Sequence, residues 1–319
     1  MWFIYAIITL MFWAIADVFY KLGAKEEDKY SHLKTGIMVG LVMGIHATIY
    51  LILNGITFSF SDMLKYLPVS FLYISSMVIG YKGLRYIELS ISSPIQNCSG
   101  VITSVLLFLI FRESLGILDI LGIVIIGIGV SYLSVLERKA QKEEKIKEKK
   151  KIKKESAKNK FIKFTKNKKV KKLATFTALM FPFLYCILDG AGTFLDSIYL
   201  DKLELINEDA ALISYEYTFF IYGMYLFIYL KLFKKEEIGV IKEKSRLFAA
   251  IFETLGQFFY VYAISGNSTL ACPIVASYSI MSVLLSRIFL KEKLTFKEYI
   301  SIFIVLSGIV VLGISEGLA

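Results

Sequence analysis

The chain alternates between long apolar stretches and short polar segments along its whole length. The apolar stretches are about twenty residues long, the length that a helix needs to cross a hydrocarbon layer of about 30 Å. The pattern therefore predicts an all-α polytopic membrane protein. We expect ten transmembrane helices, at about residues 2–20, 35–54, 64–84, 90–111, 115–136, 173–199, 210–230, 247–266, 269–290 and 297–315.

Composition supports a membrane location. Of the 319 residues, 56% are hydrophobic and only four are proline, which is more apolar surface than a soluble domain of this size could cover. Cys98, Cys186 and Cys272 fall inside predicted spans without motif spacing, so we interpret them as packing residues. The N-terminal stretch lacks a basic region and a small-residue cleavage site, which predicts a retained first helix.

Positive charge is concentrated in one segment between the two halves of the chain. Of the 37 Lys and Arg residues, 18 lie within residues 138–172, which predicts a solvated, charged linker over residues 137–172. The last part of the linker, with aromatic residues among lysines, is suited to contact with anionic membrane lipids. Nothing in it resembles a nucleic-acid-binding module, so the net charge of +10 does not indicate nucleic acid as a partner.

The distribution of charge also predicts sidedness. With ten spans, 34 of the 37 basic residues fall on the side of the linker, and three fall on the other side, namely Lys65, Arg112 and Lys202. Basic loops remain in the cytoplasm, so we expect the linker to be cytoplasmic. Both termini are then expected outside, in a multi-pass protein of a bacterial-type plasma membrane.

The two halves of the chain match each other at a fixed offset of 179 residues. The stretch SSPIQNCSGVITSVLLFLIFRESL then aligns with ACPIVASYSIMSVLLSRIFLKEKL. Each half has five predicted spans, an odd number, so the second copy enters the membrane from the opposite face. This predicts two inverted five-helix repeats, residues 1–136 and 173–319. The matched pairs are Pro94 with Pro273, Ile95 with Ile274, Leu106 with Leu285, Glu113 with Glu292, Leu115 with Leu294, Gly129 with Gly308 and, in a weaker stretch, Asp17 with Asp196 and Tyr20 with Tyr199.

This arrangement resembles the drug/metabolite transporter superfamily, specifically its EamA-like branch. The resemblance rests on a helix that opens with SPI and continues to FRESLGILDILGIVIIGIGV, repeated as CPI and FLKEKLTFKEYISIFIVLSGIVV, over about 55 residues in each half. It implies a secondary carrier that moves small metabolites or toxic compounds by alternating access through a central cavity between spans 1, 3, 4, 6, 8 and 9. Many members keep their termini in the cytoplasm, whereas the charge distribution here predicts both termini outside.

Two aspartates interrupt the predicted span 173–199, in the stretch YCILDGAGTFLDS. A carboxylate at the centre of a membrane helix costs about 2.5–3.5 kcal/mol, so it is expected to face a cavity or a partner. Asp189 is the stronger candidate for a substrate or proton site, because Gly190 and Gly192 follow it and let another backbone or a substrate approach. The alternative is that Asp189 is a hydrogen-bonded structural acid. Asp196, two turns later on nearly the same face, is expected near the outer interface, where solvent lowers its cost.

Further polar side chains at similar depth are candidate binding residues. Glu253, Gln257 and Tyr260 share one face of the predicted span 247–266. Asp17 lies on one face of the first span, where a structural pairing with Lys21 at the cytoplasmic edge is the alternative to a binding role. The complete set of substrate- or proton-binding candidates is Asp189, Glu216, Glu253, Gln257, Trp13, Asp17, Asn97, Tyr260 and Tyr278, and the candidate kinks for gating are Pro94, Pro273, Gly190 and Gly192.

Carboxylates beside aromatic rings suit a cationic or amine-bearing substrate, because the acid supplies charge and the rings supply cation–π attraction. Burial favours the protonated form of a carboxyl group, so a buried acid can exchange a proton for a cation. This predicts proton-coupled exchange, with Asp189, Glu216 and Glu253 as candidate carriers. Most of the aromatic residues are nonetheless expected to pack in the interior or to lie at the membrane interfaces.

Other features limit the range of functions. His46 lies in the middle of the predicted span 35–54, where a packing role and a proton-relay role both fit. Gly36, Gly40 and Gly44 form a small-residue face on this span, for close contact within the chain or between protomers.

The sequence has no P-loop, no glycine-rich strand-to-helix turn and no metal-ligand cluster, so we expect no enzyme activity, cofactor or metal. The expected assembly is a monomer or a homodimer.

The sequence therefore predicts a secondary active transporter, an exporter or exchanger of small metabolites or of amine-bearing and cationic compounds. Two alternatives stay open. A flippase for lipid intermediates would open its cavity sideways to the bilayer, and basic residues facing the cavity would favour it. A non-transporting membrane scaffold or sensor would need neither an inverted repeat nor acids inside the membrane.

Overall fold

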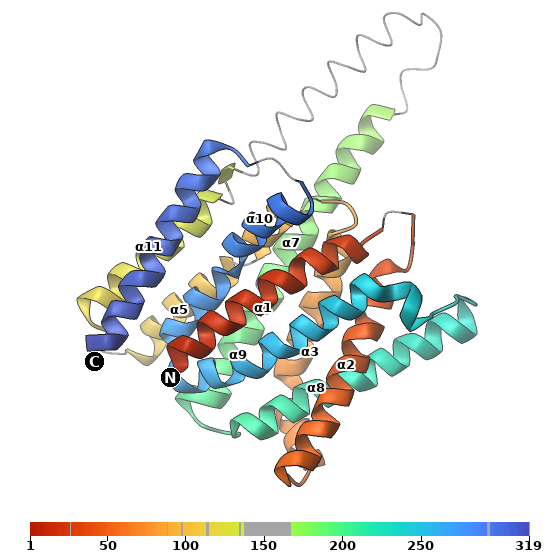
Figure 1. Cartoon of the computed structure of the whole chain (residues 1–319), viewed down its shortest axis with the longest axis horizontal. Helices are drawn as coiled ribbons and strands as arrows, with labels where there is room; N and C mark the ends of the chain where they lie inside the picture. Colours follow the sequence, from red (N-terminus) through yellow and green to blue (C-terminus); the bar gives the residue numbers. More distant parts are fainter. Residues whose placement is uncertain are drawn as a thin grey trace, which may run out of the picture.

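The structure of the chain is a computed structural model that describes residues 1–25, 27–87, 89–96, 98–112, 115–133, 135–136, 167–291 and 294–318. Every regular element within these residues is a helix (Figure 1). The elements are α1 (Trp2–Gly23), α2 (Ser31–Asn54), α3 (Phe60–Gly83), α4 (Leu89–Gln96), α5 (Cys98–Phe111), a helix at Ile117–Leu133, α7 (Asn167–Ser197), the π-helix η1 (Ile198–Lys202), α8 (Glu208–Ile228), the π-helix η2 (Tyr229–Phe233), the 3₁₀-helix η3 (Val240–Glu243), α9 (Lys244–Ala276), α10 (Tyr278–Phe289) and α11 (Phe296–Leu318).

Seven of the described helical stretches are long and apolar enough to cross a membrane. Two shorter apolar helices, Cys98–Phe111 and Ile117–Leu133, accompany them. The described chain therefore has the all-helical, multi-pass character that its apolar pattern predicts. The seven stretches are Trp2–Gly23, Ser31–Asn54, Phe60–Gly83, Met180–Lys202, Glu208–Phe233, Lys244–Phe289 and Phe296–Leu318.

Local side-chain contacts set several helix boundaries. α3 begins after Ser59, whose hydroxyl accepts a hydrogen bond from Asp62 N at 3.3 Å. α8 begins after Asn207, whose side chain accepts one from Ala210 N at 2.8 Å. α2 ends at Asn54 and is followed by Gly55, which adopts a left-handed φ of 62° that glycine tolerates best. These boundaries follow from cap residues that can be recognised in the sequence.

The stretch Lys244–Phe289 is interrupted at Asn267, which has non-helical backbone angles (φ −170°, ψ 89°). The Asn267 side chain accepts a hydrogen bond from Leu270 N at 3.1 Å, as the residue that precedes a new helix does. The break lies between the predicted spans 247–266 and 269–290. The chain therefore passes from one helical segment to the next at a single capped residue.

Helices from the first part of the chain pack along helices from the second part. α1 packs along α9, α2 along α8 and α3 along α7. The α2–α8 contact is close at Gly40, where a Cβ would lie 2.6 Å from Phe219 O and 3.0 Å from Gly223 Cα. The glycine face predicted for this span thus packs within the chain, because the missing side chains let the two backbones approach.

Helix Ile117–Leu133 crosses α11 through two glycines. A Cβ on Gly129 would overlap the side chain of Val305, and a Cβ on Gly308 would lie 2.8 Å from Ile126 Cγ1. Ser301 also donates a hydrogen bond from its hydroxyl to Gly129 O at 2.5 Å. The crossing therefore depends on close approach of the two backbones.

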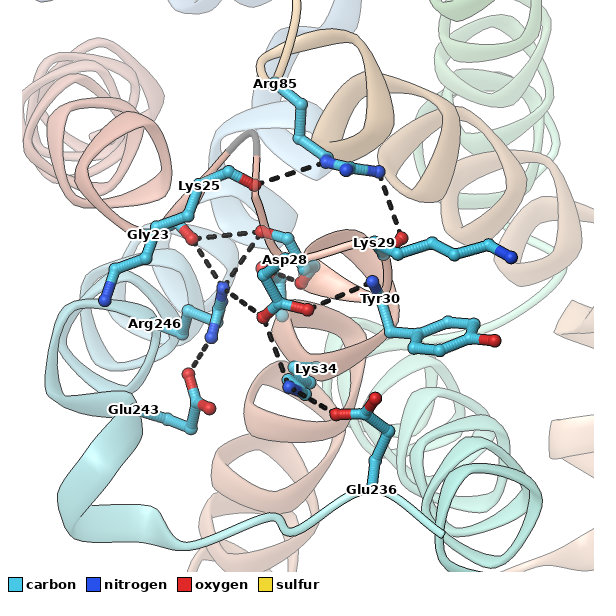
Figure 2. Close-up of polar contacts among 12 residues, drawn as sticks. Gly23, Lys25, Asp28, Lys29, Tyr30, Lys34, Arg85, Glu236, Glu243 and Arg246 are labelled. Carbon is cyan, nitrogen blue, oxygen red and sulfur yellow. Dashed lines mark hydrogen bonds and ion pairs between the residues drawn. The ribbon is translucent and has the colours of Figure 1, made fainter. Parts of the chain in front are cut away.

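A cluster of ion pairs ties the α1–α2 loop to the start of α9 (Figure 2). The guanidinium of Arg246, which is 3% exposed, donates to Gly23 O (2.7 Å), Asp28 Oδ2 (3.2 Å) and Ser31 Oγ (2.9 Å). Arg246 also forms an ion pair with Glu243. Buried charges therefore hold the loops at this end of α1. Further contacts in the cluster join Lys34 to Asp28 (3.2 Å) and Glu236 (3.0 Å), and Arg85 to the carbonyl oxygens of Lys25 (3.3 Å) and Lys29 (3.0 Å).

The two chain termini lie close to one another at one end of the molecule, and the start of α7 lies at the opposite end (Figure 1). α7 is described from Asn167, where the described residues resume, so the helix includes the lysine-rich residues just before the predicted span start at residue 173. The rest of the linker predicted over residues 137–172 lies outside the described residues.

Candidate functional site

A cavity of about 70 Å³ lies between helices from both parts of the chain. Its lining residues come from α1, α3, α4, α5, α7, α8, α9 and α10. A volume of this size has room for a few water molecules and is smaller than the pocket of a drug-sized ligand.

Two aspartates on α1 and α7 face the cavity and are held by hydroxyl groups. Asp17 accepts hydrogen bonds from Ser93 Oγ at 2.7 Å and from Ser282 Oγ at 2.8 Å. Asp189 accepts one from Ser99 Oγ at 2.8 Å. Hydroxyl donors stabilise a carboxylate without neutralising its charge, so the negative charge of each ionised aspartate remains available to a ligand.

Glu253 on α9 is the third carboxyl group of the cavity and is 8% exposed. Its backbone carbonyl accepts a hydrogen bond from Trp13 Nε1 at 3.3 Å, which fixes the indole against α9. Among the described residues that line the cavity there is no Lys, Arg or His. The lining therefore carries only acidic charge, and it attracts positively charged groups.

Aromatic rings surround these acids. The indole of Trp13 lies 4.9 Å from the Tyr260 ring and 5.7 Å from the Tyr278 ring, measured between centroids. This position requires glycine at residue 256, because a Cβ on Gly256 would overlap the indole. Ring faces beside carboxylates provide cation–π attraction for a positively charged ligand. The other aromatic residues of the lining are Tyr20, Tyr73, Tyr81, Tyr185 and Tyr215.

Asp196 lies behind the cavity wall and is fully buried. Its carboxylate accepts hydrogen bonds from Tyr66 and, at 3.4 Å, from Tyr73. The hydroxyl of Tyr73 also lies 2.6 Å from that of Tyr260, and both tyrosines line the cavity. The expected contact of Asp196 with solvent is therefore wrong, because tyrosines of α3 enclose this carboxylate inside the protein.

The cavity brings together most of the residues predicted for the site. Glu216 lies elsewhere, and its carboxylate is 2.8 Å from His46 Nδ1. Asn97 and the side chain of Pro94 lie outside the described residues, and Pro273 is buried within α9. The predicted residues that line the cavity are Asp189, Glu253, Gln257, Trp13, Asp17, Tyr260 and Tyr278.

The two glycines predicted as kinks pack against cavity-lining side chains. A Cβ on Gly190 would lie 3.4 Å from Ser99 Cβ, and a Cβ on Gly192 would lie 3.1 Å from the Tyr73 ring. Both glycines therefore let α7 approach its neighbours within an unbroken helix that runs from Asn167 to Ser197. Hydroxyls of Ser99 and Tyr73 reach the two aspartates of α7 across these contacts.

Sequence reasoning did not single out two lining residues on α7. Tyr185 lies one helical turn before Asp189, and Thr193 lies one turn after it. Their spacing from Asp189 is the signal that could have found them, because residues four apart share a helix face. Thr193 also accepts a hydrogen bond from Tyr73 at 3.2 Å. The described residues hold no group of three or more His, Cys, Asp or Glu suited to a metal ion.

Known proteins resemble the chain in sequence and in fold. The model of the EamA-like transporter family matches residues 1–135 and 209–314. One crystal structure of a protein matches with a TM-score of 0.61 and 9% sequence identity, over 95% of this chain and 97% of that chain, and at this identity it shows the fold alone. No curated protein sequence matches the chain. With the family model covering most of its length, the chain belongs to the EamA-like transporter family of the drug/metabolite transporter superfamily, a family of multi-pass membrane transporters.

Proposed function

We propose that the chain is a secondary active transporter that exports or exchanges small metabolites or amine-bearing and cationic compounds by alternating access. The charge of the cavity carries the proposal: Asp17, Asp189 and Glu253 face it, and none of the described lining residues is basic. Ionised carboxylates buried without cations are costly, so a positively charged group that enters the cavity is stabilised. The ring faces beside the acids add cation–π attraction.

The same acids suit exchange of a proton for a cation. A buried carboxyl group is most stable when it is protonated or paired with a positive charge, so a cation and a proton compete for it. Asp189 and Glu253 are the candidate carriers in the cavity, and Glu216 is a candidate outside it. Energy for transport would then come from an ion gradient or from exchange, with protons as the candidate coupling ion.

The proposal includes ten membrane crossings. A continuous helix of 46 residues, the length of Lys244–Phe289, would extend about 69 Å, roughly twice a hydrocarbon layer of about 30 Å. The break at Asn267 supports two crossings within this stretch. Each of the other long apolar helices is a candidate for one crossing. The two remaining candidates are α4 together with α5, and the helix Ile117–Leu133.

Reciprocal contacts support two inverted five-helix halves, residues 1–136 and 173–319. Gly129 contacts Val305, and Gly308 contacts Ile126. At the offset of 179, Gly129 corresponds to Gly308 and Ile126 corresponds to Val305, so the two contacts are equivalent under the repeat. An interface between two copies related by a two-fold axis repeats its contacts in this way. The crossing of Ile117–Leu133 with α11 is therefore the local evidence for the repeat.

The proposal places the linker of residues 137–172 in the cytoplasm and both termini outside, in a bacterial-type plasma membrane. Its support is the charge distribution, with 34 of the 37 basic residues on one side of a ten-span chain. The start of α7 and the two termini also lie at opposite ends of the molecule (Figure 1). Labelling of single cysteines introduced near residue 150 and near the C-terminus, in intact cells, tests this sidedness.

Two other functions are weighed against transport of cations. A flippase for lipid intermediates that carry phosphate would need basic groups in its cavity, and the described lining has none. A scaffold or sensor would not need three acids facing a cavity, since each costs free energy inside the membrane. The family is generally non-enzymatic, and we propose no cofactor, no nucleic-acid partner and a monomeric or homodimeric carrier in contact with membrane lipids.

Counterflow in proteoliposomes tests the proposal. Vesicles that contain the full chain are loaded with an unlabelled compound, and uptake of its labelled form is measured for amines, quaternary ammonium compounds, neutral metabolites and phosphorylated metabolites. We expect counterflow of positively charged compounds and a loss of about tenfold or more in Asp189→Asn, because a charged interaction is removed. Glu237→Gln, at a side chain that is 87% exposed, is the matched control.

The outcome separates the three candidate functions. Counterflow confined to phosphorylated compounds would contradict a cation-selective cavity. Translocation of a fluorescent lipid in the same vesicles, without counterflow of any soluble compound, would favour the flippase. Absence of both activities in a correctly folded preparation would favour the scaffold.

A further inference from the structure

A second pair of titratable side chains lies between helices, apart from the cavity. Glu216 on α8 is fully buried, and its two carboxylate oxygens lie 2.9 and 2.8 Å from His46 Nδ1 on α2. The side chain of His46 is 27% exposed. Neither residue lines the cavity. The pair is therefore a separate polar site within the apolar part of the protein.

Burial determines how many protons this pair holds. A carboxylate in a low-dielectric interior is costly, so Glu216 must either pair with an imidazolium or be protonated itself. In both arrangements, the two side chains together carry no net charge. They hold one proton more than a neutral His46 imidazole beside an ionised Glu216 carboxylate. Loss of that proton to water leaves one negative charge between α2 and α8. Release of the proton therefore costs free energy, because it leaves a buried charge unpaired.

Polar side chains lead from the pair to the surface at the start of α8. The Tyr50 ring stacks on the His46 imidazole, with centroids 5.9 Å apart and planes at 18°. The Tyr50 hydroxyl donates a hydrogen bond to Asp209 Oδ1 at 2.8 Å and lies 2.9 Å from the Tyr262 hydroxyl. Asp209 is half-buried in the first turn of α8. These groups therefore lie between the pair and the start of α8.

The titratable groups around the pair come from three helices. One of them, Tyr215, lines the cavity, and it directly precedes Glu216 on α8. α8 therefore presents one residue to the cavity and the next to the histidine of α2. The groups are Tyr50 on α2, Asp209, Tyr215 and Tyr217 on α8, and Tyr262 on α9.

The pair lies at a contact between the two halves of the chain. α2 belongs to the first half of the chain and α8 to the second, and they pack along each other. The same two helices touch through backbone atoms at Gly40 and Gly223. A change of charge between Glu216 and His46 therefore acts directly on the contact between the halves.

We propose that Glu216 and His46 form the site at which this carrier binds its coupling proton, separate from the cavity that binds the cargo. The inference rests on the transport function proposed above. Of the candidate proton carriers named above, it assigns the coupling proton to Glu216 together with His46, and it leaves Asp17, Asp189 and Glu253 to bind a positively charged cargo.

Infrared difference spectroscopy of the full chain in lipid vesicles tests the proton site without any cargo. Protonation of a carboxyl group produces its own C=O stretching band, which we follow as the pH is changed. Glu216→Gln keeps a hydrogen-bonding side chain beside the imidazole and removes the acid. We expect one titrating carboxyl band to be absent in Glu216→Gln and to titrate at a different pH in His46→Gln. Glu208→Gln, at a neighbouring acid in the first turn of α8, is the matched control and should retain the band.

Uptake of labelled tetraethylammonium, driven by an imposed pH gradient across proteoliposomes, is the second measurement. We expect Glu216→Gln and His46→Gln to lower this uptake about tenfold, which is within the usual range of a coupling free energy. If the carboxyl band persists in Glu216→Gln, or if both variants retain gradient-driven uptake, the assignment of the proton site is wrong while transport stands. If the unmodified chain moves no cation by counterflow or by gradient, the transport proposal fails, and the infrared band alone decides whether the pair binds a proton.

Discussion

Gly129 and Gly308 make equivalent contacts where the helix Ile117–Leu133 crosses α11. Gly129 faces Val305, and Gly308 faces Ile126, in a crossing where added Cβ atoms would overlap or crowd the facing side chain. Each half of the chain thus contributes a glycine and a β-branched residue to the same contact. Substitutions at the two glycines should have the same physical effect, although they lie in different helices.

We expect Gly129→Ala and Gly308→Ala to destabilise the protein by similar amounts, about 1–3 kcal/mol each, because an added methyl group overpacks the crossing. Thermal unfolding in detergent micelles measures the change. Gly317→Ala in α11 is the control, since no atom lies within 4 Å of its Cβ position. A large loss of stability at one glycine and none at the other would contradict the equivalence of the two contacts.

Gly256→Ala should displace Trp13, because the new methyl group would occupy the space of the indole. The Trp13 Nε1 hydrogen bond to Glu253 O would be broken, and the cavity would lose its largest ring face. We expect counterflow of cations to fall more than thermal stability does. Fluorescence in a Trp2→Phe background follows Trp13 alone, since the chain has two tryptophans. An unchanged emission spectrum would show that the indole tolerates the methyl group.

Tyr73 and Tyr260 should behave as one unit, because their hydroxyls are 2.6 Å apart and Tyr73 also donates to Asp196. We expect Tyr73→Phe and Tyr260→Phe each to cost about 1 kcal/mol of stability, and the double variant to cost less than their sum. Tyr225→Phe, at a side chain that is 63% exposed, should add independently to either change. Strict additivity for Tyr73 and Tyr260 would argue against a shared network.

Arg246→Ala should destabilise the loop cluster by about 3–5 kcal/mol, because it leaves Glu243 buried without its cation and Asp28 with Lys34 as its remaining partner. Arg246→Lys should recover only part of the loss, since an ammonium group cannot reproduce the several hydrogen bonds of the guanidinium (Figure 2). Thermal unfolding measures both variants. Lys242→Ala, at an exposed ion pair with Glu237, should change stability by less than about 1 kcal/mol. Equal stability of all three variants would show that the cluster is not a structural constraint.

The apolar pattern predicts individual helices well because the bilayer fixes both their length and their composition. α1 at Trp2–Gly23 and α11 at Phe296–Leu318 lie within a few residues of the predicted spans 2–20 and 297–315. The Lys244–Phe289 stretch contains two predicted spans, and the residue that interrupts it, Asn267, is an asparagine that caps the next segment. Length and cap chemistry are local properties, so a single sequence carries them.

The direction in which a polar side chain points depends on neighbours that are remote in sequence. Tyr215 and Tyr217 flank Glu216 in the sequence. Tyr215 faces the cavity, whereas Glu216, about 100° further around the helix, faces His46 on α2. Asp196 likewise meets Tyr66 and Tyr73 of α3, and the chain position of Asp196 alone gives no sign of that enclosure. On α9, Glu253, Gln257 and Tyr260, which the sequence places on one helix face, all line the cavity.

The uniformly acidic lining has a consequence for the electrical behaviour of the carrier. If the empty protein reorients with its acids ionised, negative charge moves through the membrane field, at about 2.3 kcal/mol per elementary charge for each 100 mV. A bound cation offsets that charge and weakens the dependence on potential. Exchange of one cation for another does not require the empty carrier to reorient. The rate of this exchange should therefore be nearly insensitive to an imposed potassium diffusion potential. The rate of one-way efflux, in contrast, should vary steeply with that potential.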